Sequence, residues 1–263
     1  MSTSFPVGDV RVRFAGATHM GMKRDHNEDA LYLPEQERLC LVADGMGGHA
    51  SGEVASTLSI ATIVDYFRAT ADEVGPTWPF STDRVTRIEE RRLGAAIRLA
   101  NARILEKARS DARYQGMGTT VVAAYFGETG AFVAHVGDSR IYRLRDGVLD
   151  QLTEDHSLLS EYIALGRVTA EDAANFPQKN VIVRALGMRE MVRADVRRVD
   201  LRVGDVFLLC TDGLSGMIDD AAIRAILLAV SDVDRVCAEL VDAANRAGGA
   251  DNVTVAVARV EAA

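Results

Sequence analysis

Two short runs of apolar residues constrain the fold of this chain more than any other feature. They are LCLVA at residues 39–43 and VFLLC at residues 206–210. Runs of this length without a polar interruption are typical of strands that are buried on both faces. An Asp-Gly pair follows each run within two residues, at Asp44-Gly45 and at Asp212-Gly213. The sequence therefore predicts buried strands that end in acidic turns.

Further strands and helices are predicted from the spacing of apolar residues. Alternation of apolar and polar residues, or a hairpin turn between two apolar segments, predicts strands at 10–18, 119–126, 131–136, 141–144, 148–152, 195–201 and 253–260. The strongest hairpin signal is the two-residue turn Asp146-Gly147. Apolar residues at helical spacing predict helices at 51–68, 93–108 and 232–246, and Ser231 is the expected N-cap of the last one.

Two segments interrupt this series. Residues 70–82 contain two prolines and the only tryptophan, and they are predicted to be a surface excursion. Residues 154–180 are polar and partly helical, with Thr169 and Asp172 as a capping pair. We expect one domain over residues 1–263, with 154–180 as a flap appended to it.

Composition and charge narrow the class of protein. The chain has 263 residues, enough to bury a substantial core. Its 38 acidic and 30 basic residues give a net charge of −8, which argues against nucleic acid as the main partner. The sequence lacks the stretch of roughly 20 apolar residues that a membrane-spanning helix needs, and it shows no secretory signal. Its three cysteines cannot all pair, so we expect buried thiols and a cytoplasmic protein.

Acidic residues gather where the predicted strands begin or end. They are Glu28, Asp29, Asp44, Asp138, Asp212 and Asp251. Because the strands of one packed sheet system tend to end near one another, we expect these carboxylates to converge. Four or more carboxylates within a few ångströms cannot all stay ionised without a counter-charge. A divalent cation is the usual source of that charge.

The types of ligand indicate which cation would bind. The sequence contains no Cys-x-x-Cys, no His-x-x-x-His and no HExxH motif, which makes zinc a poor candidate. Carboxylates, a glycine carbonyl and water suit Mg²⁺ or Mn²⁺. Gly45 matters because a residue without a Cβ can turn sharply and offer its carbonyl to the metal.

Each of these features also has a purely structural explanation. An Asp-Gly pair after a strand is usually only a turn. The stretch DGMGGHASGE could cradle a phosphate at a helix N-terminus, but it lacks the Gly-Lys-Ser/Thr ending of a P-loop. Taken alone, His49 is more often a polar residue at a helix start than an acid catalyst, and Arg24 is more often a solvated charge. The residues by themselves leave both explanations open.

The combination and order of six motifs identify a family resemblance. The motifs are Thr18-x-x-Gly21-x-x-Arg24-x-x-Asn27-Glu28-Asp29; Val42-Ala43-Asp44-Gly45-Met46-Gly47-Gly48-His49 with Ser51-Gly52-Glu53; Gly116-Met117-Gly118-Thr119-Thr120; Val136-Gly137-Asp138-Ser139-Arg140; Cys210-Thr211-Asp212-Gly213-Leu214; and Asp251-Asn252-Val253-Thr254. From about residue 12 to residue 260, the chain resembles the metal-dependent protein serine/threonine phosphatases of type 2C, in their bacterial form.

The resemblance implies an α+β fold, a four-layer αββα sandwich in which helix pairs flank two antiparallel sheets, with a flap near the metal site. It also implies that the site holds Mn²⁺ or Mg²⁺, as two ions or three. Asp44 would bridge two ions, the Gly45 carbonyl would bind one of them, and Asp212 and Asp251 would complete the other. Asp138, paired with Asp212, would hold the third ion.

The resemblance assigns roles to four more residues. Glu28 and Asp29 would hold metal-bound waters. Arg24 would bind the substrate phosphate, and His49 would be the general acid. The implied reaction is hydrolysis of phosphoserine or phosphothreonine by a metal-bridging hydroxide that attacks phosphorus in line, without a phospho-enzyme.

The same resemblance implies phosphorylated proteins as partners, serine/threonine protein kinases among them, and a monomeric enzyme without nucleic-acid or membrane partners. Two alternatives are a phosphoprotein-binding scaffold with little turnover and a phosphatase for small phosphate esters. A complete set of metal ligands argues against the scaffold. A polar flap beside the site suits an extended protein substrate better than a small ester.

Overall fold

Two large antiparallel sheets form the centre of the molecule. The computed structural model describes residues 2–48, 51–71, 84–169, 172, 176, 178 and 181–263. In spatial order, the six-stranded sheet contains β1 (Thr3–Val7), β2 (Val10–His19), β13 (Val253–Ala262), β12 (Val206–Cys210), β9 (Arg140–Arg145) and β10 (Val148–Gln151). The five-stranded sheet contains β11 (Asp195–Val199), β8 (Gly130–Val136), β7 (Val121–Gly127), β4 (Leu39–Ala43) and β3 (Ala30–Tyr32). A small ribbon pairs β5 (Gly45–Met46) with β6 (Gly118–Thr119).

The two sheets pack face to face through a shared apolar core. Phe126 of β7 makes edge-on contacts with Phe14 and Phe207, which belong to the other sheet, at ring-centroid distances of 5.1 and 5.5 Å. All three rings are fully buried. The aromatic cluster therefore joins β7 to β2 and β12 across the middle of the sandwich.

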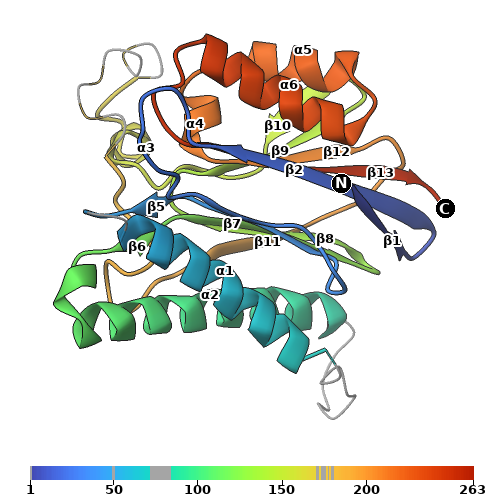
Figure 1. Cartoon of the computed structure of the whole chain (residues 1–263). Helices are drawn as coiled ribbons and strands as arrows, with labels where there is room; N and C mark the ends of the chain where they lie inside the picture. The colour runs from blue at the N-terminus through green and yellow to red at the C-terminus, as the bar shows by residue number, and fades with distance from the viewer. Residues whose placement is uncertain are drawn as a thin grey trace.

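Helices cover the outer face of each sheet, as Figure 1 shows. The helices α1 (Ser51–Ala69) and α2 (Arg84–Ser110) pack on the five-stranded sheet. The helices α5 (Asp220–Ala229) and α6 (Val233–Arg246) pack on the six-stranded sheet. This arrangement confirms the predicted four-layer αββα sandwich. Among the described residues, no helix is long and apolar enough to cross a membrane.

Burial on both faces of the central strands is also confirmed. In β4, Leu41 faces the helices α1 and α2, whereas its neighbour Val42 faces the other sheet, and both are fully buried. The predicted hairpin turn is present, because Asp146 and Gly147 join β9 to β10 with φ angles of 49° and 77°. Two consecutive positive φ angles are those of a type I′ turn.

Some helix boundaries differ from the prediction. The N-cap of α6 is Asp232 and not Ser231, because the Asp232 carboxylate accepts a hydrogen bond from the N–H of Arg235. The helix α2 begins at Arg84, nine residues before the predicted start at Leu93. Its first part is rich in charged residues, which form helices well but give no apolar periodicity. The short elements β1, α4 (Asp212–Ser215) and η1 (Ala112–Tyr114), and the longer helix α5, were not predicted.

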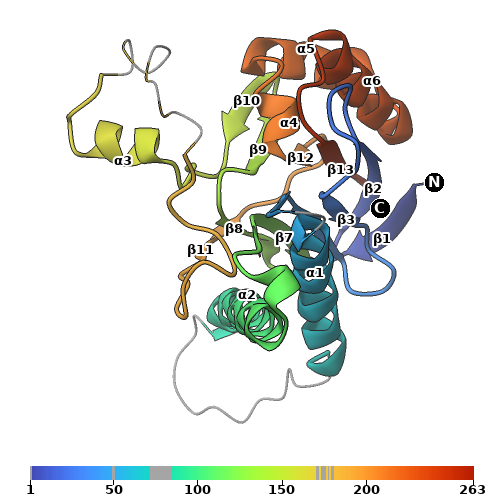
Figure 2. The same cartoon turned by 60° about the vertical axis from the view of Figure 1, so that its left-hand side comes forward.

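The predicted flap is described in part. It contains the helix α3 (Leu158–Ala164), whose N-cap Ser157 accepts a hydrogen bond from the N–H of Ser160. Figure 2 shows α3 beside the sandwich, away from both helix layers. The Thr169 hydroxyl accepts a hydrogen bond from the N–H of Asp172 at 3.2 Å, as the capping prediction requires, but the segment around them lies largely outside the described residues. The predicted excursion at 70–82 also lies outside them, apart from residues 70 and 71.

Candidate metal centre and active site

The pairing of the strands brings the predicted acidic turns to one end of the sandwich. The end of β4 lies beside the start of β7, where Val42 pairs with Val122, and the start of β7 lies beside the end of β8. Asp44 and Asp138 therefore follow the two strands that flank β7, one on each side of its start. In the other sheet, the end of β12 lies beside the start of β13, which brings Asp212 close to Asp251.

Two threonines hold the turn that carries Asp44. The Thr120 N–H and the Thr119 hydroxyl donate to the carbonyl of Asp44 at 2.9 and 2.8 Å. The Asp44 N–H donates to the Thr120 hydroxyl at 3.0 Å, and this hydroxyl also pairs with the Ser139 hydroxyl at 2.7 Å. Because Ser139 follows Asp138, the same buried network positions both acidic turns.

A second network joins the two sheets at this end. The Thr211 hydroxyl, which follows β12, donates to Asp29 Oδ2 at 3.0 Å, and Asp29 precedes β3 of the other sheet. The Thr211 hydroxyl also accepts a hydrogen bond from the N–H of Thr254 at 3.0 Å. The acidic cluster therefore takes Asp29, Asp44 and Asp138 from the five-stranded side and Asp212 and Asp251 from the six-stranded side.

Asn252 fixes the loop that carries Arg24 and Glu28. Its side-chain nitrogen donates to the carbonyls of Met20 and His26, each at 2.9 Å. Its side-chain oxygen accepts from the N–H of Glu28 at 2.8 Å. The loop between β2 and β3 is thus bound to the start of β13, so that Glu28 lies at the same end of the sandwich as the acidic cluster.

The carboxylates perturb one another because they are buried together. Burial first, and then the charges of Asp29, Asp212 and Asp138, hold the pKa of Asp44 well above its usual range. Burial and the nearby charge of Asp212 raise the pKa of Asp138 to about 7. Burial raises the pKa of Asp29 to about 7 despite its hydrogen bonds from Thr211 and Thr254. The pKa of Asp212 is also raised, chiefly by burial.

The donor set fits a hard divalent cation. Among the described residues, the buried oxygens Asp29 Oδ1 and Asp138 Oδ1 have no hydrogen-bond partner. Buried carboxylate oxygens without a partner, in a cluster that repels its own charges, are the arrangement that a cation would stabilise. The donors are all oxygens, which suits Mg²⁺ or Mn²⁺.

Gly45 lies where a side chain has no room. A Cβ at this position would fall 2.2 Å from the carbonyl oxygen of Gly52 and 2.4 Å from that of Glu28. Gly52, in the first turn of α1, is equally constrained, because its Cβ would lie 2.8 Å from the Glu28 carboxyl carbon. This close packing places the backbone of Gly45 directly beside Glu28.

Of the two predicted catalytic residues, Arg24 and His49, the structure describes only Arg24. Arg24 lies at the site, where its guanidinium forms an ion pair of 2.7 Å with Asp251, and both side chains are partly exposed. His49 lies outside the described residues. The structure therefore brings together Arg24, Glu28, Asp29, Asp44, Gly45, Asp138, Asp212 and Asp251.

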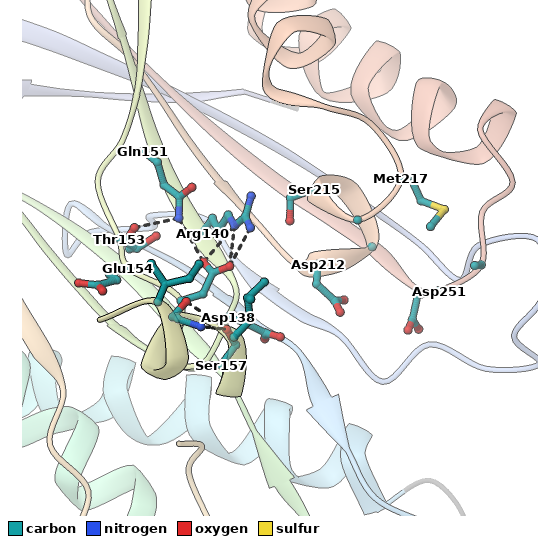
Figure 3. A pocket seen from close by; sticks show the side chains of 17 residues that line it. Asp138, Arg140, Gln151, Thr153, Glu154, Ser157, Asp212, Ser215, Met217 and Asp251 are labelled. Atoms are coloured by element: carbon teal, nitrogen blue, oxygen red, sulfur yellow. Dashed lines mark hydrogen bonds and ion pairs between the residues drawn. The ribbon is translucent and has the colours of Figure 1, made fainter. Parts of the chain in front are cut away.

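A cavity of about 800 Å³ opens beside the acidic cluster. Figure 3 shows Asp212 and Asp251 on one side of it, with Thr153 and Glu154 on the opposite side. The flap forms part of the wall through Ser157, Ser160 and Ile163. The cavity therefore lies between the acidic cluster and the flap.

Sequence reasoning missed Asp155, which lines the same cavity. Its carboxylate pairs with Arg140 through two nitrogens, at 3.0 Å to Nε and 2.7 Å to Nη2. The pairing orders the wall next to Asp138. The one available signal was the arginine that follows Asp138 closely in its motif, since a partly buried guanidinium requires an acidic partner.

Comparison with known proteins places the chain in a family. The profile of the family described as "Protein phosphatase 2C" matches residues 15–253. The chain is 38% identical over 246 residues to the serine/threonine phosphatase stp of Listeria innocua, an alignment that covers 90% of this chain and 92% of the relative.

Solved structures agree with the sequence comparison. The serine/threonine phosphatase PstP/Ppp of Mycobacterium tuberculosis superposes with a TM-score of 0.83 at 38% identity, over 96% of this chain and 99% of that one. The catalytic domain of PstP in complex with two manganese ions superposes with a TM-score of 0.78 at 37% identity, over the same shares of the two chains. The chain therefore belongs to the protein phosphatase 2C family, as its six motifs indicate, and it is a protein phosphatase.

Proposed function

We propose that this protein hydrolyses phosphoserine and phosphothreonine in other proteins and depends on Mn²⁺ or Mg²⁺ to do so. The observation that carries the proposal is the convergence of five buried or partly buried aspartates, from both sheets, at one end of the sandwich, where three of them (Asp138, Asp212 and Asp251) line a cavity. The names of the relatives support the substrate class, and the manganese complex of PstP supports the metal.

The metal ions would be held by the carboxylates of Asp44, Asp212 and Asp251 and by the Gly45 carbonyl, with Asp138 at a third ion. When bound, such ions activate water and neutralise charge on the phosphoryl oxygens. Asp29 and Glu28 lie next to these residues and would orient the waters around the ions.

The chain's own residues bind the phosphate and supply the proton. Arg24 lies at the edge of the acidic cluster, and a guanidinium fork is well shaped for phosphate oxygens. His49 follows Gly48 in the glycine-rich motif and is proposed to protonate the leaving serine or threonine oxygen. An alkoxide is a poor leaving group, so this proton is needed for protein substrates.

We propose a single displacement without a phospho-enzyme, and the cysteines support it. Cys40, Cys210 and Cys237 are all free and buried. Burial raises the pKa of Cys210 and of Cys237 to about 12 and that of Cys40 further still. A thiol in this state is not a phosphate acceptor, because the nucleophile is the thiolate.

The flap beside the cavity favours an extended phosphoprotein over a small ester as substrate. Serine/threonine kinases among the substrates, a cytoplasmic location, a monomeric state and a single domain over 1–263 stay predictions.

The test is hydrolysis of para-nitrophenyl phosphate and of phosphothreonine peptides after chelation and after addition of single metals. We expect no activity after chelation and recovery with Mn²⁺ or Mg²⁺. Asp44→Asn, Asp212→Asn and Asp251→Asn should each lower turnover by several orders of magnitude, whereas Asp150→Asn, on a half-exposed residue of β10, should not. Full activity without divalent metal would refute the proposal. Phosphopeptide binding without turnover would favour the scaffold.

A further inference from the structure

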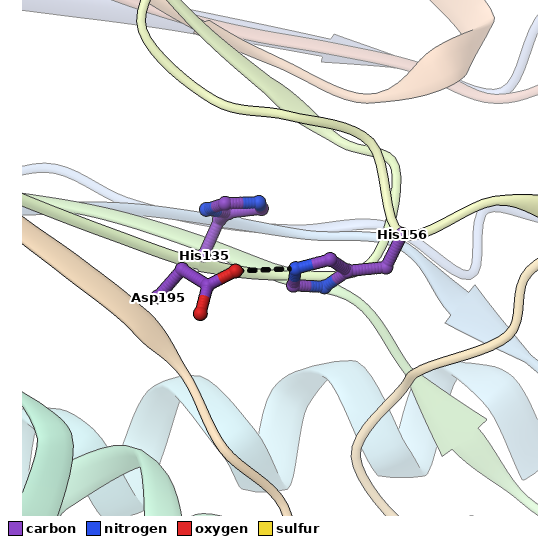
Figure 4. Close-up of side chains that lie close together, drawn as sticks. All are labelled: His135, His156 and Asp195. Atoms are coloured by element: carbon purple, nitrogen blue, oxygen red, sulfur yellow. Dashed lines mark hydrogen bonds and ion pairs between the residues drawn. The ribbon is translucent and has the colours of Figure 1, made fainter. Parts of the chain in front are cut away.

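A second cluster of titratable residues lies outside the acidic centre. It consists of His135 on β8, His156 at the start of the flap and Asp195 at the start of β11, after the flap returns (Figure 4). The two imidazole rings are buried and stacked, with centroids 4.4 Å apart and an angle of 19° between the planes. None of these residues is used in the proposed reaction.

The hydrogen bond from Gly137 assigns the tautomer of His156, because a backbone N–H can only donate. The backbone N–H of Gly137 donates to His156 Nδ1 at 3.0 Å, so Nδ1 carries a lone pair. The ring proton is therefore on Nε2, which donates to Asp195 Oδ2 at 2.9 Å. Burial lowers the pKa of His156 to about 4, which keeps the ring neutral near pH 7.

This tautomer argues against a metal ion in the cluster. A metal ligand needs a lone pair on the nitrogen that faces the other ligands, and Nε2 has none. Arg184 Nη1 also lies 2.9 Å from His156 Nε2 and 3.3 Å from Asp195 Oδ2, so that a cationic group already stands beside the carboxylate. The three residues therefore form a hydrogen-bonded chain and not a second metal site.

These hydrogen bonds connect His156 to the acidic cluster through Gly137, the residue before Asp138. Besides the bond to the ring, the Gly137 carbonyl accepts from the His156 N–H at 2.9 Å. His156 therefore fixes both the N–H and the carbonyl of Gly137. Gly137 has a φ of 112° and immediately precedes Asp138. A rotation of this backbone would redirect the Asp138 carboxylate.

The same residue fixes the flap. The His156 carbonyl accepts from the N–H of Val183 at 2.9 Å, and the next residue, Ser157, pairs with Ile182 in an isolated antiparallel bridge. His156 thereby joins the outgoing and the returning segments of the flap to the end of β8. Ser157 and Asp138 line the same cavity.

We infer that His156 is a positioning residue: with Asp195 holding its Nε2–H, its Nδ1 fixes the Gly137 backbone and so aims the Asp138 carboxylate at the cation that this residue is proposed to bind. The inference rests on the proposed function, because it deepens the role given there to Asp138. It assigns the two ring nitrogens different tasks, and these can be separated by substitution.

The experiment compares His156→Asn with His156→Gln. The Asn side-chain oxygen lies where Nδ1 lies and can still accept from Gly137, but Asn does not reach Asp195. The Gln amide lies where Nε2 lies and can still donate to Asp195, but it leaves the Gly137 N–H without an acceptor. The matched control is His135→Gln, which alters the stacked pair without a bond to Gly137 and keeps a donor toward the carbonyl of Glu154.

The primary measurement is Mn²⁺ binding by calorimetry, without substrate, together with the Mn²⁺ concentration that gives half-maximal activity. We expect His156→Gln to weaken the Asp138-dependent ion and to raise the half-maximal Mn²⁺ concentration by about tenfold or more, while the other ions still bind. His156→Asn and His135→Gln should stay within about threefold of the wild type. Asp195→Ala should also weaken Mn²⁺ binding, but less than His156→Gln does, because the Asp195 side chain is half-exposed.

A double substitution separates positioning from a general loss of structure. If His156 acts through Asp138, His156→Gln should cause no further loss in an Asp138→Ala protein. If the double variant binds Mn²⁺ more weakly than Asp138→Ala alone, the inference is overturned. It is also overturned if His156→Gln and His156→Asn weaken Mn²⁺ binding equally and in proportion to their loss of thermal stability. Ion binding is read directly, so the result stands apart from activity: a protein that binds Mn²⁺ as expected yet hydrolyses no phosphoester refutes the proposed function and not the role of His156.

Discussion

Arg24 and Asp251 form an ion pair at the edge of the acidic cluster, with Arg24 Nη2 2.7 Å from Asp251 Oδ2. The family motifs give the two residues different partners, a phosphate for the arginine and a metal ion for the aspartate. Because a cation on Asp251 would compete with Arg24 for the same carboxylate, we expect metal binding to release the guanidinium toward the substrate. We therefore expect metal binding to favour phosphate binding through this pair.

Arg24→Ala should mainly raise KM, because the arginine is proposed to contact a phosphate that is already present in the ground state. Hydrogen bonds to charged groups contribute about 1.5–3 kcal/mol, which corresponds to a rise in KM of about 10- to 150-fold. Steady-state kinetics on a phosphothreonine peptide measure it. The matched control is Arg13→Ala, which removes an exposed arginine paired with Glu261 on the strands β2 and β13. An unchanged KM in Arg24→Ala would remove the phosphate role.

Gly45→Ala should disrupt the metal centre, because the new Cβ would collide with the carbonyl oxygens of Gly52 and Glu28. We expect loss of Mn²⁺ binding by calorimetry and loss of thermal stability together. Gly94→Ala in α2 is the matched control: its Cβ has no neighbour nearer than 3.5 Å, and alanine is the better helix former by about 1 kcal/mol. Normal Mn²⁺ binding by Gly45→Ala would show that the surrounding backbone can move to make room for the Cβ.

Glu37 should make stability depend on acid pH. Burial alone would raise the pKa of Glu37, but hydrogen bonds from Arg68 and Tyr32 outweigh it and lower the pKa to about 2. The unfolded chain then binds more protons between about pH 4.5 and pH 2 than the folded chain does, so this stabilisation is complete above pH 4.5 and is lost as the pH falls toward 2.

The variant Glu37→Gln tests this. It should lower the free energy of unfolding at pH 7 by about 1–3 kcal/mol, and the difference from the wild type should shrink toward pH 2. Glu35→Gln is the control, because Glu35 also pairs with Arg68 but its side chain is 68% exposed, and exposed pairs contribute little. A difference that stays constant with pH would mean that the charge of Glu37 is not involved.

Phe126→Ala should destabilise the sandwich without removing any residue of the site. The ring contacts Phe14 and Phe207 of the opposite sheet, and loss of a buried phenylalanine typically costs about 3–5 kcal/mol. Denaturant unfolding measures the loss, and Phe126→Leu should recover part of it. Wild-type stability in Phe126→Ala would show that the sheets are not held together at this ring.

The central strands were predictable because their burial on both faces leaves an unbroken apolar run. The pairing of the strands was not, because it depends on contacts between distant segments: β2 and β13 pair along ten residues, although more than 230 residues separate them. The helix α5 was missed because it is short and because only Ile223 and Leu227 are buried on it, too few residues to show a period.

The carboxylates of the site were predictable for a different reason. Antiparallel neighbours place the end of one strand beside the start of the next, so the acidic turns of Asp212 and Asp251 converge. The side chains that hold these turns were less visible, because Thr120, Thr211 and Asn252 are also ordinary turn residues. His156 gave no signal at all, since its role depends on Gly137, nineteen residues away in the chain.

The five aspartates of the acidic cluster come from both sheets, and their charges affect how firmly the sheets are held together. Buried like charges at one end of the sandwich repel, which favours separation of the sheets there, whereas Phe126 holds them together in the middle. A cation bound to Asp44 and Asp212 at once would be a cross-link between the two sheets. At a free-metal concentration of 100 times the dissociation constant, such a link adds about 2.7 kcal/mol to the free energy of unfolding. Backbone amide exchange at this end should therefore report the metal content of the protein, with the fastest exchange in the chelated form.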